Sequence, residues 1–228
     1  MMSENLFKAI RQGDSSKIER MLNKNGSLAN SKDSSGMTPV VIATYYGQPK
    51  IAQIIIEHGA KLDLFEAAMT GQLEIVKQIA AKDQSSINSY SKDGYTALHL
   101  AAFFGHLDVA KFLIQSGAKI DIASTNAMKV TPLHSAAARN QLEISELLLS
   151  SGANANAKQD GDFTPLHAAA QNGSIEMAQL LIRHGADVNA KTKEGKRPLD
   201  MIREEGRESG PKDKRDAVAI FLVENGDL

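Results

Sequence analysis

A thirty-three-residue period is the feature that most restricts how this chain can fold. The phrase Thr-Pro-Leu-His at residues 131–134 returns at 164–167, and the altered phrase Arg-Pro-Leu-Asp follows at 197–200, each copy thirty-three residues after the last. Related phrases begin upstream at Thr96 and Thr38. A fixed period of this length is typical of stacked supersecondary units, because no single unit can bury its apolar face alone. The sequence therefore predicts a solenoid whose task is binding.

The composition narrows the classes of partner and chemistry. The formal net charge is −1, so the chain carries no basic field that would attract a phosphate backbone, and we expect no nucleic-acid partner. The absence of cysteine excludes disulfides, thiolate catalysis and thiolate metal sites. The sequence shows no signal-peptide pattern and no apolar run of membrane-spanning length. We therefore expect no membrane association and a cytoplasmic location, with export by a signal-free route as the alternative.

The stretch 161–189 shows how one unit is built. Thr164 can cap a helix through its side-chain oxygen, and Pro165 suits the first helical position, where no N–H is needed. Alanines then lead to Gly173, where this helix is expected to turn. The next helix carries apolar residues at helical spacing, and Gly185 stands where a helix end favours a left-handed residue. The predicted unit is a helix, a turn, a second helix and a projecting loop.

Two of these units closely resemble the ankyrin repeat. One combines Thr-Pro-Leu-His-Ala-Ala-Ala at 164–170 with Gly-Ala-Asp-Val-Asn-Ala at 185–190, and the other combines the phrase at 131–134 with Gly-Ala-Asn-Ala-Asn-Ala at 152–157. The resemblance spans about residues 5 to 226. It implies an all-α repeat solenoid of stacked helix-turn-helix units with short β-hairpin loops. It also implies an L-shaped stack whose concave face binds proteins.

We expect a single ankyrin-repeat domain over residues 1–228. Its predicted parts are an N-terminal capping repeat, five repeats and a C-terminal capping repeat, at 1–36, 37–63, 64–94, 95–129, 130–162, 163–195 and 196–228. In the first cap, Lys8 and Arg11 stand at positions that are otherwise apolar, as a soluble end requires. The last cap contains an insertion at 207–215, which we expect to be a solvated loop, with contact to a partner as the alternative.

The repeat at 64–94 is shortened. The turn glycines Gly47 and Gly71 are only twenty-four residues apart, so nine residues of the period are missing between Asp63 and Leu64. The missing segment would hold the projecting loop and the Thr-Pro helix start. We predict a notch in the row of loop tips, and the alternative is a neutral deletion over which the helices still stack.

No catalytic or cofactor motif is evident. His99, His134 and His167 occupy one slot of the repeated phrase, and in the ankyrin family that histidine links adjacent loops by hydrogen bonds. Stacked units would place these residues about 10 Å apart, which is too far for a shared metal ion. The sequence has no nucleophile elbow, no phosphate-binding Gly-Lys-Ser/Thr loop and no dinucleotide glycine motif. We therefore expect a non-catalytic protein without cofactor or metal.

Aromatic residues gather at positions that ankyrin geometry would place on the concave face. These positions are the two residues before each turn glycine and the residue before each helix start. The chain has eleven Tyr and Phe, and six of them fall there. Rigid aromatics with arginine commonly anchor interfaces, although partial burial against neighbouring loops is the alternative. The predicted partner-binding residues are Met37, Tyr45, Tyr46, Met69, Tyr95, Phe103, Phe104, Arg139, Phe163, Gln171 and Asn172.

The leading interpretation is a scaffold or adaptor that binds a protein or peptide through preformed shape complementarity. The predicted groove is aromatic first and polar near Arg139, so a partner with an apolar anchor and a polar or acidic flank would suit it. Two alternatives stay open. One is a homodimer closed through the same aromatic residues, in place of the expected monomer. The other is hydroxylation of loop asparagines, which the resemblance implies for Asn156 and Asn189.

Overall fold

A computed structural model describes residues 2–203 and 212–226 of the chain. Within these ranges the secondary structure is helical, with turns and bends between the helices and no β-strand. The α-helices are α1 (Met2–Gln12), α2 (Ser15–Lys24), α3 (Pro39–Tyr45), α4 (Pro49–Glu57), α5 (Leu64–Met69), α6 (Leu73–Lys82), α7 (Ala97–Phe104), α8 (Leu107–Gln115), α9 (Pro132–Ala138), α10 (Leu142–Ser150), α11 (Pro165–Gln171), α12 (Ile175–Arg183), α13 (Pro198–Arg203) and α14 (Lys212–Asn225). Three short 3-10 helices lie in the loops: η1 (Gly26–Asn30), η2 (Gln84–Asn88) and η3 (Asp160–Asp162).

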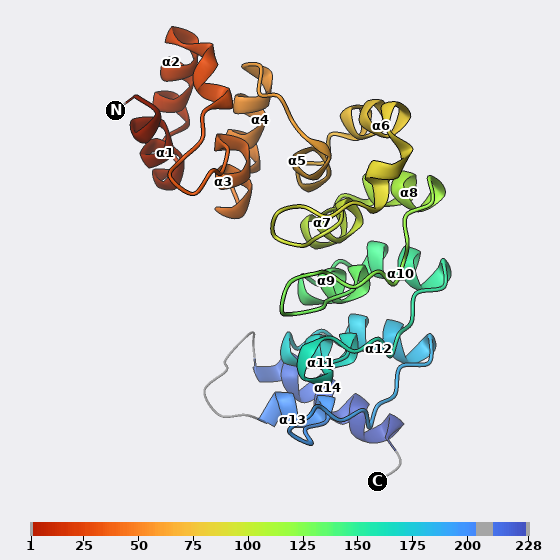
Figure 1. Ribbon diagram of the computed structural model, residues 1–228. Helices are drawn as coiled ribbons and strands as arrows, with labels where there is room; N and C mark the ends of the chain where they lie inside the picture. The colour runs from red at the N-terminus through yellow and green to blue at the C-terminus, as the bar shows by residue number, and fades with distance from the viewer. Residues whose placement is uncertain (1, 204–211, 227–228) are drawn as a thin grey trace.

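The helices are arranged in two rows (Figure 1). The odd-numbered helices form an inner row, and the even-numbered helices form an outer row. Each inner helix packs against the next inner helix and against its own outer helix. Every unit therefore covers the apolar face of its neighbour, and the predicted all-α repeat solenoid is confirmed.

Polar N-caps fix where the inner helices begin. Helix α9 starts at Pro132, and the side chain of Thr131 accepts the His134 N–H at 3.5 Å. Helix α5 lacks the Thr-Pro start and uses a capping box instead, in which the Asp63 carboxylate accepts the Glu66 N–H at 2.8 Å. The helix start is therefore preserved even in the shortened repeat.

The projecting loops are tight turns rather than β-hairpins, which corrects the expectation from the sequence. In one of these tips the Ser91 N–H donates to the Tyr95 carbonyl at 2.8 Å. The following residue, Thr96, is already the N-cap of α7. Because the chain enters a helix at once, a single residue pair is in antiparallel register, which is too short for a strand.

Neighbouring tips from residue 89 onward are joined by backbone hydrogen bonds. Three such bonds, each 2.9 Å long, run from Thr125 N to the Gly94 carbonyl, from Asp160 N to the Met128 carbonyl and from Lys193 N to the Gly161 carbonyl. Asparagine side chains add further links, since Asn88 Nδ2 donates to the Gly117 carbonyl at 3.0 Å and its Oδ1 accepts the Lys119 N–H at 2.8 Å. These bonds make the tips of this part of the chain a continuous row.

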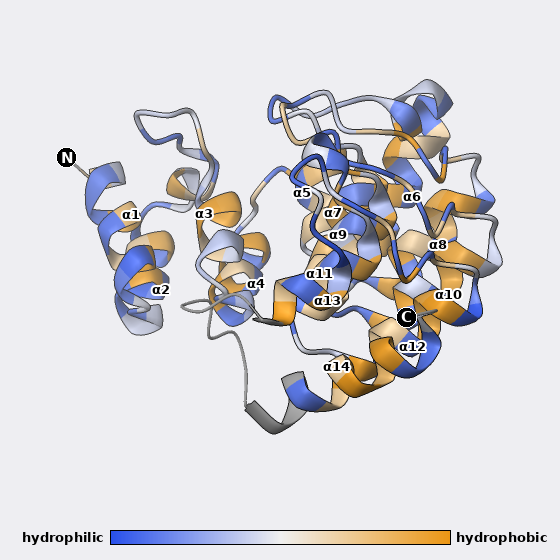
Figure 2. Cartoon of the chain, turned by 90° about the horizontal axis from the view of Figure 1, so that it is seen from below, coloured by the Kyte–Doolittle hydropathy of each residue, from blue (hydrophilic) through white to orange (hydrophobic). Residues whose placement is uncertain are grey.

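The apolar core is divided at the shortened repeat. Buried side chains from Leu6 to Ile55 form one cluster, those from Leu64 to Leu222 form a larger one, and Leu62 packs against both. Figure 1 shows the stack turning between α4 and α5, and Figure 2 shows α1–α4 set apart from the longer rows. We call residues 2–63 the first block and the described residues from 64 onward the second block.

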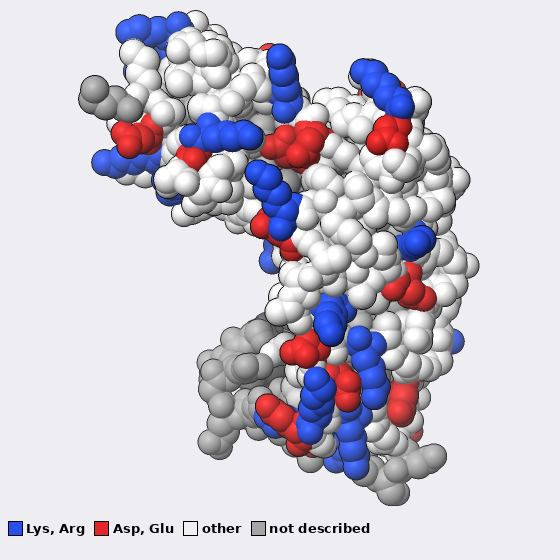
Figure 3. Space-filling model, in the orientation of Figure 1, with Lys and Arg blue, Asp and Glu red and all other residues white. Residues whose placement is uncertain are grey.

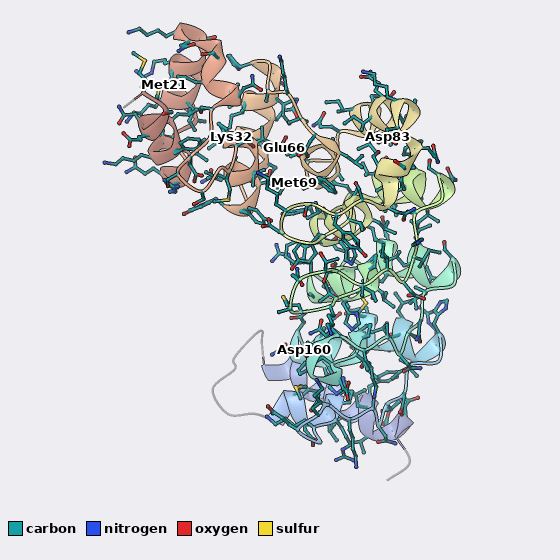
Figure 4. The ribbon with its side chains drawn as sticks, viewed as in Figure 1. Met21, Lys32, Glu66, Met69, Asp83 and Asp160 are labelled. Carbon is teal, nitrogen blue, oxygen red and sulfur yellow. The ribbon has the colours of Figure 1, made fainter. Side chains whose placement is uncertain are left out.

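The connection between the blocks has no projecting tip. Residues 58–63 lead directly from α4 to α5, so the row of tips is interrupted where the shortened repeat predicts a notch. Across this junction, Thr38 Oγ1 donates to Glu66 Oε1 at 2.6 Å. Glu66 is buried, and Figure 4 shows it on α5 between the two blocks. The junction is therefore narrow and partly polar, whereas the other inner helices meet through apolar side chains.

The segments predicted as caps lie at the two ends of the chain, and the structure describes them in part. Lys8 and Arg11 are exposed on α1, as predicted for a soluble N-terminal end. The predicted loop insertion at 207–215 lies partly outside the described residues. The description resumes at Lys212 within α14, so the final part of that segment is helical rather than a loop.

None of the described helices has both the length and the apolar character needed to cross a membrane.

Alanine substitutions at two turn glycines should distinguish backbone strain from crowding. Gly47 and Gly71 have positive φ angles of 66° and 73°. A Cβ at Gly47 would meet nothing within 4 Å, whereas one at Gly71 would lie 2.5 Å from His106 Nδ1. His106 Nε2 also bonds the Met69 carbonyl at 3.0 Å, so the ring cannot move without losing that bond.

We expect Gly47→Ala to lower the free energy of unfolding by about 1 kcal/mol and Gly71→Ala by about 2–3 kcal/mol. Urea denaturation followed by circular dichroism at 222 nm measures both losses under the same conditions. Equal losses in the two variants would show that His106 does not restrain this turn.

Candidate functional site

The inner row and the tips border a hollow on one side of the molecule, and its surface is largely uncharged in this view (Figure 3). A pocket of about 370 Å³ opens there beside α7, α9 and α11. Leu100, Ser135 and Ala168 contribute to it from these three inner helices. Six of the predicted binding residues line it: Tyr45, Tyr95, Phe103, Phe104, Phe163 and Gln171.

Three aromatic rings and one guanidinium form a contact series at the ends of the inner helices. The Tyr45 and Phe104 rings meet edge to face with centroids 6.0 Å apart, and Phe103 and Phe104 do so at 5.1 Å. The Arg139 guanidinium carbon lies 5.2 Å from the centroid of Phe103. We call Tyr45, Phe104, Phe103 and Arg139 the aromatic ladder. It runs from the first block across α7 to the end of α9.

The ladder bridges the two blocks because α5 has a small residue at its end. Counted from the first helical residue, Tyr45, Thr70 and Phe103 occupy the same position of their repeats. Thr70 carries no ring, which leaves room for Tyr45 to reach the aromatic pair of α7. The ladder therefore joins side chains from repeats that are not adjacent in the sequence.

The prediction that Met69 is presented on the concave face is wrong, since only 3% of this residue is exposed. Helix α5 reaches its turn glycine one residue earlier than the other inner helices do. Counting back from the glycine therefore assigned Met69 to the seventh helical position, whereas Met69 is the sixth residue of α5. Its position in the helix is that of Ala102 and Ala137, which are also buried.

The aromatic residues of the tips are partly buried against the following helix. The Tyr95 ring lies 5.9 Å from the His99 ring, and the Phe163 ring lies 5.0 Å from the His167 ring. The sequence left open that these aromatic residues are partly buried against neighbouring parts of the repeat. Tyr95 and Phe163 do both, because each packs against its repeat and also lines the pocket. Tyr45 and Tyr46 differ from them in being 50% and 55% exposed.

The remaining predicted residues divide into exposed and structural groups. Met37 and Arg139 are exposed. Asn172 is exposed as well, but its Nδ2 donates to the carbonyls of Ala137 and Ala138 at 3.2 Å. The amide of Asn172 therefore serves to join α11 to α9.

Sequence reasoning missed Met128, which lines the pocket and is 51% exposed. The Tyr95 hydroxyl lies 3.9 Å from the Met128 sulfur. The spacing between Tyr95 and Val130 is thirty-five residues, two more than the period, so the tip that carries Met128 is longer than the others. That excess length was the signal that could have identified Met128.

The repeated histidines hold the tips in place. His99 Nδ1 accepts the Thr96 N–H at 3.2 Å, and its Nε2 donates to the Val130 carbonyl at 2.9 Å. His134 and His167 make the same pair of contacts in their repeats. Burial lowers the pKa of His99 and of His134 to about 4, because charging either ring would place a cation in a desolvated site. Both nitrogens of each of these three rings are engaged in hydrogen bonds, so the rings serve to hold the tips.

The two loop asparagines considered for hydroxylation are both exposed. Asn156 Nδ2 donates to the Gly185 carbonyl at 2.8 Å, and its Oδ1 accepts the Asp187 N–H at 2.7 Å. The side chain of Asn156 thus joins successive repeats, as Asn88 does. Within the described ranges, no group of three or more His, Asp or Glu is placed to hold a metal ion.

Comparison with known proteins gives relatives that match part of the chain. Alpha-latrocrustotoxin-Lt1a of Latrodectus tredecimguttatus is 33% identical over 120 residues, covering 49% of this chain and 8% of the toxin. Ankyrin repeat domain-containing protein SAT10 of Stachybotrys chartarum is 28% identical over 135 residues, covering 55% and 7%. Ankyrin repeat and SAM domain-containing protein 6 of Mus musculus is 37% identical over 65 residues, covering 28% and 7%. The chain spans less than a tenth of the length of these curated relatives.

A family model described as ankyrin repeats in three copies matches residues 64–159 and 133–209. The match begins at Leu64, which is also the first residue of the larger core cluster. It includes all three copies of the histidine that joins adjacent tips. The chain therefore belongs to the ankyrin-repeat family.

Proposed function

We propose that this chain is a non-catalytic interaction scaffold that binds a protein or peptide on its concave face. Ankyrin repeats generally mediate protein–protein interaction. The observation that best supports this particular surface is the aromatic ladder beside a 370 Å³ pocket, with Tyr45 half exposed at one end and Arg139 exposed at the other. Such rigid rings lose little conformational entropy when a partner covers them.

The chemistry of the ladder favours a partner with an apolar anchor and an acidic flank. The pocket walls include Phe103, Phe104 and Met128, which suit an aromatic or branched aliphatic side chain. The Arg139 guanidinium stacks on Phe103, so its planar edge is held ready for a carboxylate. An acidic residue a few positions from the anchor would reach Arg139 while the anchor fills the pocket.

Selection from a displayed library of random twelve-residue peptides tests this proposal without a known partner. Peptides selected on the wild-type chain should share an apolar anchor. Their affinity should fall at least about tenfold for a Phe103→Ser, Phe104→Ser variant, since each ring contributes more than 1 kcal/mol at the centre of an interface. Titration calorimetry with synthesised peptides measures the change.

The matched control is Ile220→Ser, which removes another exposed apolar side chain on α14, away from the ladder. Circular dichroism must show that all variants remain helical. Equal affinities of the peptides for both variants would reject the concave face as the site. The homodimer alternative is tested by light scattering, which gives the molar mass of the unliganded chain at the same concentrations. A dimer closed through the ladder would dissociate in the double variant.

A further inference from the structure

The notch between the blocks leaves backbone groups without the partners that equivalent groups have elsewhere in the row. In each bonded pair of tips, the donor is the second residue of the later tip, represented by Thr125, Asp160 and Lys193. The acceptor is the carbonyl one or two residues before the last residue of the earlier tip, as in Gly94, Met128 and Gly161. This rule identifies which groups the missing tip of the shortened repeat would have met.

The counterpart of the donor after the notch is Lys92, and the counterparts of the acceptor before it are Ser35 and Gly36. Within the described part of the chain, neither the Lys92 N–H nor the Ser35 and Gly36 carbonyls form a hydrogen bond to the protein. All three residues line one pocket of about 410 Å³. The notch is therefore bordered by one free donor that follows it in the sequence and by free acceptors that precede it.

Apolar residues of α5 and charged residues of both signs line this pocket. Phe65 and Met69 of α5 lie between the blocks, and Met37 is 37% exposed at the first tip. Figure 4 shows Lys32, Glu66 and Met69 along this junction. The charged residues that line the pocket are Lys32, Lys92, Asp63, Asp93 and the buried Glu66, so charges of both signs surround it. Backbone pairing and apolar contact are therefore the features that distinguish an occupant.

We propose that the notch is a docking site for a β-turn of a partner protein, which takes the place of the missing tip. A carbonyl of that turn accepts the Lys92 N–H, and one of its N–H groups donates to the Ser35 or Gly36 carbonyl. An apolar side chain next to the turn covers Phe65. This site differs from the proposed concave-face site in the backbone groups that it uses, which belong to the tips, and Tyr45 of the aromatic ladder lines both pockets.

A peptide that copies one of the chain's own tips is the direct probe, since such tips already form these bonds elsewhere in the row. The probe is a fluorescently labelled, end-capped peptide with the sequence of residues 154–165, and fluorescence anisotropy follows its binding. Lys92 is the second residue of a turn closed by the Gly94 N–H and the Ser91 carbonyl at 2.9 Å, a position that accepts proline. Lys92→Pro therefore removes the N–H and keeps the turn.

We expect saturable binding to the wild-type chain and to Lys92→Ala with affinities within about twofold of each other, and a loss of about tenfold in Lys92→Pro, as for one backbone hydrogen bond. A second variant replaces residues 61–63 by the sequence of residues 154–164. This graft fills the notch with a covalent tip, so it should raise the melting temperature and abolish binding of the probe.

Equal binding by Lys92→Ala and Lys92→Pro would overturn the proposal, because the side chain alone or another surface would then explain the affinity. Absence of saturable binding to the wild-type chain up to millimolar probe would overturn it too. A scrambled peptide of the same composition controls for nonspecific association. The Phe103→Ser, Phe104→Ser variant should bind the probe as the wild type does, which keeps this test distinct from that of the concave face.

Discussion

Acidification from pH 7 to pH 5 should lower the free energy of unfolding of the second block by about 4 kcal/mol, with about 2 kcal/mol from each of two buried histidines. His99 and His134 are neutral in the folded chain, where burial holds their pKa at about 4. In the unfolded chain their pKa returns to about 6.5. Between these values the unfolded state binds more protons, so stability present at neutral pH is lost as the pH falls through this window.

Urea titrations at several pH values, followed by circular dichroism, give the slope of the unfolding free energy against pH. Burial lowers the pKa of His106 and His167 as well, so both add to the loss in the same direction. A His99→Gln variant can still donate to the Val130 carbonyl and cannot titrate. Its loss between pH 7 and pH 5 should be smaller by about 2 kcal/mol than that of the wild type. An unchanged loss would mean that His99 is not a buried neutral ring.

The two blocks should unfold as separate units, and core substitutions should act on one block at a time. Leu133 is fully buried on α9 in the larger cluster, and Ile42 is 2% exposed on α3 in the smaller cluster. Truncating a buried aliphatic side chain to alanine costs about 2–5 kcal/mol, because the lost contacts leave a cavity. In a solenoid this cost is confined to the units that exchange contacts.

Native-state hydrogen exchange read by mass spectrometry assigns the loss to a block. Leu133→Ala should lower the opening free energy of amides in α7–α12 by several kcal/mol and leave α1–α4 within about 0.5 kcal/mol of the wild type. Ile42→Ala should do the reverse. In the wild type, α1–α4 should exchange first, since the smaller cluster buries less apolar surface. Uniform loss of protection along the whole chain in either variant would refute the division at Leu62.

The repeated phrase allowed the inner helices and the histidines that link adjacent tips to be predicted, because the same residues recur in register in successive units. Thr131 and Pro132 fix a helix start locally, and the histidine at the third helical position can reach the next tip in any regular stack. The shortened repeat was visible in the spacing of Gly47 and Gly71. Features of this kind follow from local chemistry that is repeated in register.

Features that depend on exact register or on several units were missed. Met69 was misplaced because α5 is one residue shorter before its glycine, and a count from the helix start would have avoided this error. The contact between Tyr45 and Phe104 depends on a small Thr70 in the intervening repeat, which no single-unit pattern reveals. The β-hairpins were expected from the family resemblance, and the immediate helix starts replace them with turns.

The most direct test of the concave-face proposal is a hydrogen-exchange comparison of the wild-type chain with and without a selected peptide bound at saturating concentration. The account predicts slower exchange at the ends of α3, α7 and α9 and in the tips that carry Tyr95, Met128 and Phe163. The outer helices α8, α10 and α12 should exchange as before. Protection confined to those outer helices, with none at the aromatic ladder, would contradict the account.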